Sequence, residues 1–337
     1  MLLHLFALLV AASTALLIFA GGMVTSTGSG LAVPDWPNTY GYFLWTFPFK
    51  GWVGGVFYEH THRLIASVVG LLIMALAVWL WRAEPRAWVR RLGYVAVAAV
   101  ITQGILGGLT VLFYLPDPIS IAHAGLAQIV FCLTMTIAVA TSPGWKRGYA
   151  PGGTSADDRV LQRTALITTA LVYLQIIVGA TMRHTEAGLA IPDFPLAFGH
   201  LIPPEWNAKI AIHFAHRVGA VIVGVMAIAT AGHVLYHQRA QRSLVRGAVL
   251  LLALVTVQIT LGALTVLSGR QPIINSLHVV TGASVLATIL GLTLRAHRPR
   301  FTAEAQVSAA RGDSGLRDAG RTVAAGDLTP RKSGARA

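Results

Sequence analysis

The stretch "GLAVPDWPNTYG" at residues 30–41 recurs as "GLAIPDFPLAFG" at residues 188–199. Gly, Leu, Ala, Pro, Asp and Pro return in register, and the similarity extends beyond these segments. The ten residues "QGILGGLTVL" that begin at Gln103 match "QITLGALTVL", which begins at Gln258. Self-similarity at one long period is typical of a duplicated architecture. The chain therefore divides near residue 155 into two similar units.

The composition indicates an integral membrane protein. Of 337 residues, 55% are hydrophobic and only 12% are charged, which lies outside the usual balance of a soluble domain. Eight stretches lack Asp, Glu, Lys and Arg and are long enough to cross a hydrocarbon core of about 30 Å. We interpret the first as a retained span rather than a signal peptide, because no Lys or Arg precedes it. The expected spans are Leu2–Val24, Leu64–Trp81, Leu92–Leu115, Ile119–Ala140, Thr164–Met182, Val218–His237, Gly247–Leu267 and Asn275–Leu294.

The basic residues predict the orientation of these spans. Eleven Lys and Arg fall in one set of short loops and four in the opposite set, and basic loops tend to stay cytoplasmic. Both termini are therefore expected in the cytoplasm. Because four spans form each unit, both units enter the membrane in the same direction and are expected to be related by an axis along the membrane normal.

The predicted fold class is an all-α integral membrane protein, with eight transmembrane helices arranged as two tandem four-helix bundles. The expected divisions are an N-terminal bundle at residues 1–145, a cytoplasmic linker at 146–163, a C-terminal bundle at 164–294 and a disordered basic cytoplasmic tail at 295–337.

Charge and cysteine content exclude several functions. The net charge of +13 follows the topology rather than forming a nucleic-acid reading surface, so no nucleic acid partner is expected. The basic tail is suited to anionic membrane lipid. Cys132 is the only cysteine, which excludes an internal disulfide and a thiolate metal cluster.

Four of the twelve histidines occupy duplicated positions near the outer ends of spans. "THRLIASVVG" matches "AHRVGAVIVG", which pairs His62 with His216, and the match at Gln103 pairs His123 with His278. Two imidazoles that reach one depth from facing helices could be the axial ligands of a haem iron. A single histidine inside a span is more often a packing residue, but four in duplicated positions favour two haem-type sites.

The neighbours of these histidines offer further candidates, each with a plainer alternative. Arg63 and Arg217 follow the proposed ligands and could pair with haem propionates, or they could simply anchor the helix at the interface. Glu59 precedes His62 by three residues and shares its helix face, whereas His213 stands at the equivalent place. A carboxylate there could accept a proton or stabilise a developing cation; the alternative is a cap in a helical first turn.

Two more features have an interpretation of their own. The repeated glycines, among them Gly107 and Gly262, lie at spacings that let helices pack closely, and we expect packing alone from them. The repeated Pro-Asp-aromatic-Pro segments are expected to form structured outer turns that act as a lid. His60 lies about 200° from His62 around a helix and is expected to face away from the site.

Together these motifs resemble the haem A synthase family. The segments that carry the resemblance are "GGMVTSTGSGLAVPDWPNTYG" from Gly21, "EHTHR" from Glu59, "AHAGLAQ" around His123, "HFAHR" from His213 and "NSLHVVTG" around His278. The resemblance covers about residues 1–295. It implies eight spans in two four-helix bundles and an oxidoreductase that converts the ring methyl of haem O to the formyl group of haem A, for terminal oxidases.

The resemblance also implies roles for individual residues. His216 and His278 would ligate a haem B cofactor, which would transfer electrons. His62 and His123 would flank the substrate haem O, with Glu59 catalytically important. The chain is expected in the bacterial cytoplasmic (inner) membrane, with the haem sites toward its extracytoplasmic side. Expected partners are a haem O synthase and an electron donor that the sequence does not identify, and a homo-oligomer is left open.

One departure from the family and two rival functions remain. Many members carry a cysteine pair in the first outer loop, and this chain has none there, which leaves the route of electron delivery open. The rivals are a dihaem protein that transfers electrons from quinol without modifying haem, and an eight-span carrier, which a parallel duplication alone would permit.

Overall fold

The computed structural model describes residues 1–147 and 158–298, and its regular structure in these ranges is helical apart from two isolated bridges. Most of the predicted linker and nearly all of the predicted tail lie outside the described residues. The elements are α1 (Leu2–Ser26), η1 (Leu44–Thr46), η2 (Phe49–Gly51), α2 (Gly54–Ala83), α3 (Ala87–Leu112), α4 (Asp117–Thr141), α5 (Pro143–Arg147), α6 (Arg159–His184), α7 (Ala208–His237), α8 (Arg242–Leu267) and α9 (Pro272–Ala296).

Eight of the helices are long and apolar enough to cross a membrane, and they match the eight predicted spans. Helices α2 and α7 begin ten residues before the predicted Leu64 and Val218. The charge-free criterion started each span directly after Arg63 or Arg217, although the helix continues through these residues. His62 and His216 therefore lie two turns inside their helices rather than at the start.

The boundary predicted for the linker also differs from the structure. Residues 159–163 belong to α6, because the carboxylate of Asp158 accepts a hydrogen bond from the Leu161 N–H at 2.9 Å and caps the helix. The short helix α5 precedes the undescribed segment. Asp158 also contacts Nε2 of His233 at 2.8 Å, so this helix start is held to α7.

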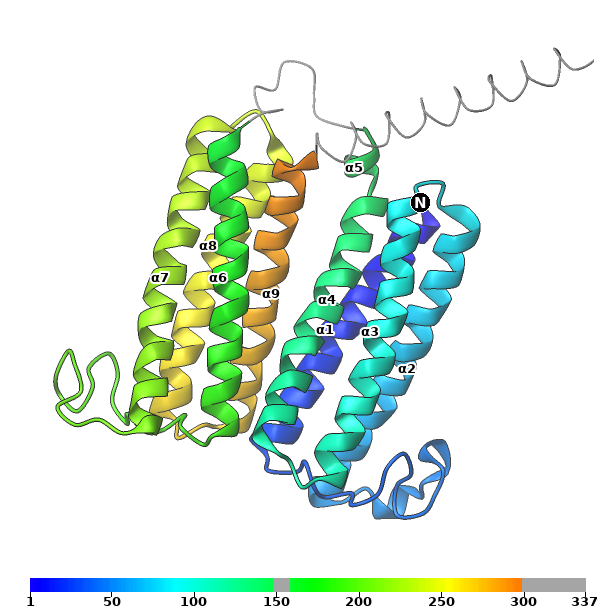
Figure 1. The fold of residues 1–337 in the computed structure, drawn as a ribbon, viewed down its shortest axis with the longest axis vertical. Coiled ribbons are helices and arrows are strands. Elements are labelled where there is room, and N and C mark those ends of the chain that lie inside the picture. Colours follow the sequence, from blue (N-terminus) through cyan, green and yellow to red (C-terminus); the bar gives the residue numbers. More distant parts are fainter. Residues whose placement is uncertain (148–157, 299–337) are drawn as a thin grey trace, which may run out of the picture. The chain divides into compact units, whose positions relative to one another are not determined.

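The spanning helices gather in two groups (Figure 1), and their contacts assign four helices to each. In the first group α1, α2, α3 and α4 pack in a closed ring, each against the next, with α4 returning to α1. Helices α6, α7, α8 and α9 form a second ring of the same kind. Each ring has its own apolar core. Consequently α2 stands diagonally opposite α4, and α7 diagonally opposite α9.

The two rings meet where α4 of the first contacts α9 of the second, and α9 also packs on α1. In α4 and α9, 50% of the apolar 18-residue segment is buried inside the protein, compared with 11–28% in the other spanning helices. A small apolar cluster of Ile18, Phe131, Ala283 and Ala287 fills the contact. The outward faces carry large exposed apolar side chains, such as Leu71, Ile105 and Val225, as expected for surfaces that meet lipid tails.

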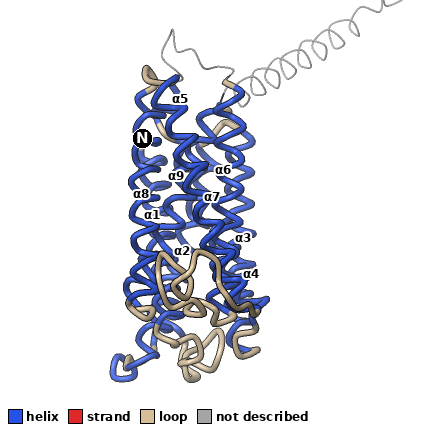
Figure 2. Tube along the Cα trace, turned by 90° about the vertical axis from the view of Figure 1, so that its left-hand side faces the viewer, coloured by secondary structure: helices blue, strands red, loops and turns tan. Residues whose placement is uncertain are grey.

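The two long loops, residues 27–53 and 185–207, lie at one end of the helices, and the N-terminus and α5 lie at the other (Figures 1 and 2). The four duplicated histidines belong to the loop end, because each falls within the first three turns of its helix. The fold thus brings the repeated loops and the repeated histidines together.

Candidate functional site

The four duplicated histidines form two pairs, one in each ring. His62 and His216 are the ninth residues of α2 and α7, and His123 and His278 are the seventh residues of α4 and α9. The two histidines of each pair belong to helices that stand diagonally opposite each other. Their imidazoles therefore approach from opposite sides of the four-helix ring. The ring centroids of His216 and His278 are 6.4 Å apart, and His62 and His123 lie close enough for their charges to interact. All four side chains are half-buried.

Each of these imidazoles lies against a glycine of the preceding helix. A methyl group built on Gly21 of α1 would stand 3.0 Å from Cε1 of His62, and one on Gly107 of α3 would stand 3.1 Å from Cε1 of His123. Such contacts are tighter than ordinary van der Waals distance. The backbone therefore leaves room for the ring only because no side chain is present.

The second ring repeats this arrangement. The corresponding distances are 2.9 Å from Gly179 of α6 to Cε1 of His216 and 3.0 Å from Gly262 of α8 to Cε1 of His278. The expectation that Gly107 and Gly262 serve helix packing alone is therefore incomplete, because they seat the candidate ligands. Gly21 and Gly179 were missed, although the repeat places them at the same spacing of 158 residues as the two outer loops.

The polar partners of the imidazoles differ between the rings. Nδ1 of His278 lies 3.1 Å from the carbonyl oxygen of Gln258, and its Nε2 lies 3.3 Å from the side-chain amide nitrogen of the same residue. The first contact places the proton on Nδ1 and the lone pair on Nε2, where a metal would displace the Gln258 amide. Nδ1 of His216 lies 3.0 Å from the side-chain amide of Gln175. By contrast, Nδ1 of His62 is buried without a hydrogen-bond partner.

These residues fit haem iron better than a metal held by protein ligands alone. Among residues 1–147 and 158–298 there is no cluster of three or more His, Cys, Asp or Glu side chains able to hold a metal ion. Two imidazoles that face each other across an apolar four-helix ring suit an iron that receives its other ligands from a macrocycle. Each ring therefore has the donor set of a bis-histidine haem site.

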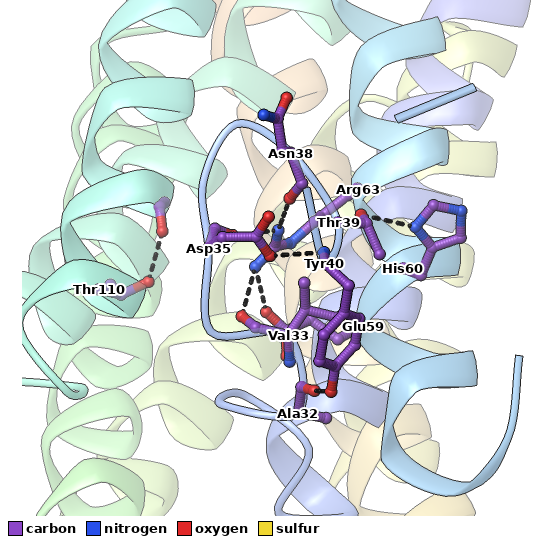
Figure 3. Close-up of polar contacts among 11 residues, drawn as sticks. Ala32, Val33, Asp35, Asn38, Thr39, Tyr40, Glu59, His60, Arg63 and Thr110 are labelled. Atoms are coloured by element: carbon purple, nitrogen blue, oxygen red, sulfur yellow. Dashed lines mark hydrogen bonds and ion pairs between the residues drawn. The ribbon is translucent and has the colours of Figure 1, made fainter. Parts of the chain in front are cut away.

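The arginines that follow His62 and His216 clamp the repeated loops. Arg63 donates from Nη1 to the carbonyl oxygens of Asp35 and Asn38 at 2.7 and 2.8 Å, and from Nη2 to that of Val33 at 3.0 Å (Figure 3). Nη2 also forms an ion pair with Glu59 at 2.5 Å. The terminal nitrogens of this guanidinium are thus occupied by the first loop and by Glu59.

Arg217 holds the second loop in the same way. Its Nη1 donates to the carbonyl oxygen of Leu196 at 2.8 Å, and its Nη2 donates to those of Ile191 and Asp193 at 3.1 and 2.6 Å. The direct contacts of Arg217 are thus with loop carbonyls. The pairing of Arg63 and Arg217 with haem propionates stays a prediction.

The repeated aspartates fold the loops into identical turns. The carboxylate of Asp35 accepts the backbone N–H of Tyr40 at 2.8 Å (Figure 3). It also accepts the backbone N–H of Gly41 at 2.8 Å. Burial raises the pKa of this carboxyl, but the Gly41 and Tyr40 N–H groups and the Arg63 charge outweigh it and hold the pKa below its ordinary value. Hydrogen bonds to a carboxylate favour its charged form, so Asp35 stays ionised in its turn.

In the second loop, Asp193 accepts the N–H groups of Phe198 and Gly199, again at 2.8 Å. The pKa of Asp193 is lowered chiefly by the Gly199 N–H. Tyr40 and Phe198 both have positive φ, 50° and 55°, a strained conformation that these hydrogen bonds support. The repeated sequence therefore specifies a repeated turn.

Glu59 and His213 occupy equivalent positions and make equivalent contacts. Oε2 of Glu59 accepts the Val33 N–H at 2.8 Å, and Nδ1 of His213 accepts the Ile191 N–H at 3.2 Å. Both side chains are buried. Each residue thus anchors its loop to the helix that carries a candidate ligand, and only Glu59 adds an ion pair with the following arginine.

His60 belongs to the first loop's packing. Its Nδ1 lies 3.0 Å from Oγ1 of Thr39 (Figure 3), and its ring contacts the rings of Phe47 and Trp52, with centroids 5.0 and 4.7 Å away. The side chain is fully buried. His60 therefore stands apart from His62.

The fold and these sites define a multi-pass helical membrane protein with two paired-histidine centres. The family model described as "Cytochrome oxidase assembly protein" (COX15-CtaA) matches residues 46–290, and the chain belongs to this family. It is similar to "Heme A synthase" of Symbiobacterium thermophilum, with 31% identity over 84% of this chain and 94% of that protein. "Heme A synthase" of Shouchella clausii is 29% identical over 82% of this chain and 90% of that protein.

Proposed function

We propose that this protein is a haem A synthase, a membrane oxidoreductase that converts the ring methyl of haem O to a formyl group. The observation that carries the proposal is the diagonal pair of glycine-seated imidazoles in each ring. Membership of a cytochrome oxidase assembly family and the names of the relatives support it. A dihaem electron-transfer protein could use similar centres, but the relatives favour haem modification.

The two sites have different tasks in this proposal. His62 and His123 hold the substrate haem O, and His216 and His278 hold haem B. Haem B supplies an electron-transfer centre when bound. The polar contacts of α2 and α7 support this division, since Nδ1 is partnered at His216 and unpartnered at His62. A partnered imidazole is fixed in orientation, which suits a resident cofactor, whereas a substrate has to leave.

Glu59 is the proposed catalytic acid–base residue of the first site. It is buried, it lies three residues before His62 on one helix, and its pairing with Arg63 favours a carboxylate able to receive a proton. Arg63 and Arg217 serve the sites by fixing the loops at their mouths. In the second site His213 replaces the acid, which supports placing the methyl oxidation in the first.

The proposed topology is a tandem pair of four-helix bundles, α1–α4 and α6–α9, related by an axis along the membrane normal. Both termini are cytoplasmic, the membrane is the bacterial inner membrane, and the haem sites face its extracytoplasmic side. The excess of Lys and Arg in the opposite loops supports this orientation. A haem O synthase supplies the substrate, and a separate electron donor serves the second site.

The test combines haem analysis with product analysis. Pyridine-haemochrome spectra of the purified protein are compared with those of His62→Ala and His216→Ala, and haems are extracted from the same membranes. We expect His216→Ala to lose haem B, and His62→Ala to retain it while forming no formyl-haem. Loss of haem B from His62→Ala alone would contradict the division between sites. A parent protein that makes no formyl-haem from haem O would contradict the function.

A further inference from the structure

Arg183 distinguishes the second half of the molecule from the first. It lies in the last turn of α6, and its Nη2 donates to the carbonyl oxygen of Gly22 at 2.8 Å and to Oγ of Ser26 at 2.7 Å, both in α1. At the repeat spacing of 158 residues its counterpart is Thr25. The first half thus has no cation at this position.

Arg183 has no carboxylate partner within the part of the chain that the structure describes. Only Nη2 of its guanidinium forms hydrogen bonds, and both acceptors are uncharged. The charged side chain that acts on it is Arg270, which has the same sign. Arg63 and Arg217 differ, because both of their terminal nitrogens are engaged by loop carbonyls. A partly buried guanidinium beside a second cation is unfavourable unless an anion neutralises it.

The position of Arg183 links it to the second pair of histidines. Its acceptor Ser26 also contacts Oγ of Ser276 at 3.1 Å and Nδ2 of Asn275 at 3.2 Å. Asn275 precedes His278 by three residues, so both lie on one face of α9. Arg183 and His278 are close enough for their charges to interact. The unneutralised cation therefore stands beside the second site.

We infer that Arg183 is the carboxylate-binding residue of the second site, where it pairs with a propionate of the haem held by His216 and His278. This inference rests on the proposed function. The contacts with Gly22 and Ser26 orient the guanidinium from one nitrogen and leave its other N–H groups for charge-assisted hydrogen bonds to the carboxylate. It replaces Arg217, whose terminal nitrogens hold the loop, as the direct partner.

The test compares haem B with its dimethyl ester, which has the same ring and iron but no free carboxylate. Haem-depleted full-length protein with His62→Ala and His123→Ala leaves only the second site, and binding is followed by the Soret band. We expect haem B to bind about tenfold more tightly than the ester. Arg183→Gln is expected to remove this preference by weakening haem B alone. Arg217→Gln is the matched control and is expected to retain the preference.

Equal weakening of both ligands by Arg183→Gln would overturn the inference, because Arg183 would then only join α6 to α1. A preference that survives the substitution would also overturn it, whether another residue or a lipid phosphate is involved. If Arg183→Gln does not fold, Arg183→Lys decides, since a retained charge preserves part of the preference and leaves ester affinity unchanged. Absence of His216-dependent Soret binding in the parent would refute the proposed function itself, and this inference with it.

Discussion

The two halves of the molecule share one frame and differ beside their histidines. Glycine seats, aspartate turns and arginine clamps recur in both halves with nearly the same distances. The differences are concentrated in the side chains around the rings. The place of Glu59 in the first half is taken by His213 in the second, and the place of Thr25 is taken by Arg183. The duplication has thus kept what positions the paired histidines and changed the side chains beside them.

A further difference lies behind the imidazoles of α2 and α7. Gln175 reaches Nδ1 of His216, and it passes over Gly219, where a methyl group would stand only 2.1 Å from Oε1 of Gln175. In the first half the equivalent positions are Leu17 and Ile65, which pack against the apolar core. A polar pair in one half is therefore matched by an apolar pair in the other.

The largest expected effect would break the shared frame. Gly179→Val would drive a side chain into the ring of His216, and Gly107→Val would do the same to His123. We expect Gly179→Val to lose haem B, and Gly107→Val to retain it but form no formyl-haem. Haemochrome spectra and extracted haems are the measurements.

Gly104→Val provides the matched control for these seats. Gly104 lies on α3 one turn from Gly107, and a methyl group built there meets nothing within 4 Å. The haem content and the product of Gly104→Val are expected to match those of the parent protein. A Gly107→Val protein that still forms formyl-haem at the parent's rate would show that the seat does not position His123.

The second prediction exchanges Glu59 for the residue of the other half. Glu59→His would keep an acceptor for the Val33 N–H, as His213 keeps one for Ile191, but it removes the carboxylate. We expect haem content to stay near the parent's and the rate of formyl-haem formation to fall by about 10²- to 10³-fold. The rate is measured from haems extracted over time.

His213→Gln is the control for this exchange, because the amide oxygen can also accept the loop N–H. It is expected to change the rate by less than about twofold. If Glu59→His converts haem O as fast as the parent does, then Glu59 serves only to anchor the loop.

The sequence predicted the eight helices and the pairing of histidines because both depend on patterns along the chain. Charge-free runs locate spans, and a duplication places His62 with His216 in register. The start of α2 was missed because Arg63 interrupts the apolar run, although its guanidinium turns back to loop carbonyls. Packing within each group of four helices decides which helices stand diagonally opposite. It also decides which glycine faces which imidazole. For that reason the seats of His62 and His216 became visible only in the structure.

The third prediction converts the second site toward the first. The double substitution Gln175→Leu and Gly219→Ile supplies the apolar pair found in the first half and removes the contact with Nδ1 of His216. Loss of such a partner typically weakens metal binding by about 10- to 100-fold. We expect haem B to transfer to apomyoglobin about tenfold faster than from the parent.

The single Gly219→Ile substitution tests the same contact from the other side, since its side chain would displace Gln175. It is expected to release haem at least as fast as the double variant does. An unchanged transfer rate in both variants would show that Gln175 does not hold His216 in place.

The smallest expected effect concerns pH and the first loop. Because the folded pKa of Asp35 is below its ordinary value of 3.8, its stabilisation of the turn is fully present above about pH 4 and is lost as pH falls through the folded pKa. Trp36 follows Asp35 directly, so the emission difference between the parent and Trp36→Phe reports the loop. We expect this signal to change below pH 4 in the parent, and Asp35→Asn to show the altered signal already at pH 5.

Asp193→Asn, in the loop that has Phe194 instead, is expected to leave the signal as in the parent. Were Asp35→Asn to keep the parent's transition, another group would control the turn, and the equivalence of the two aspartates would fail.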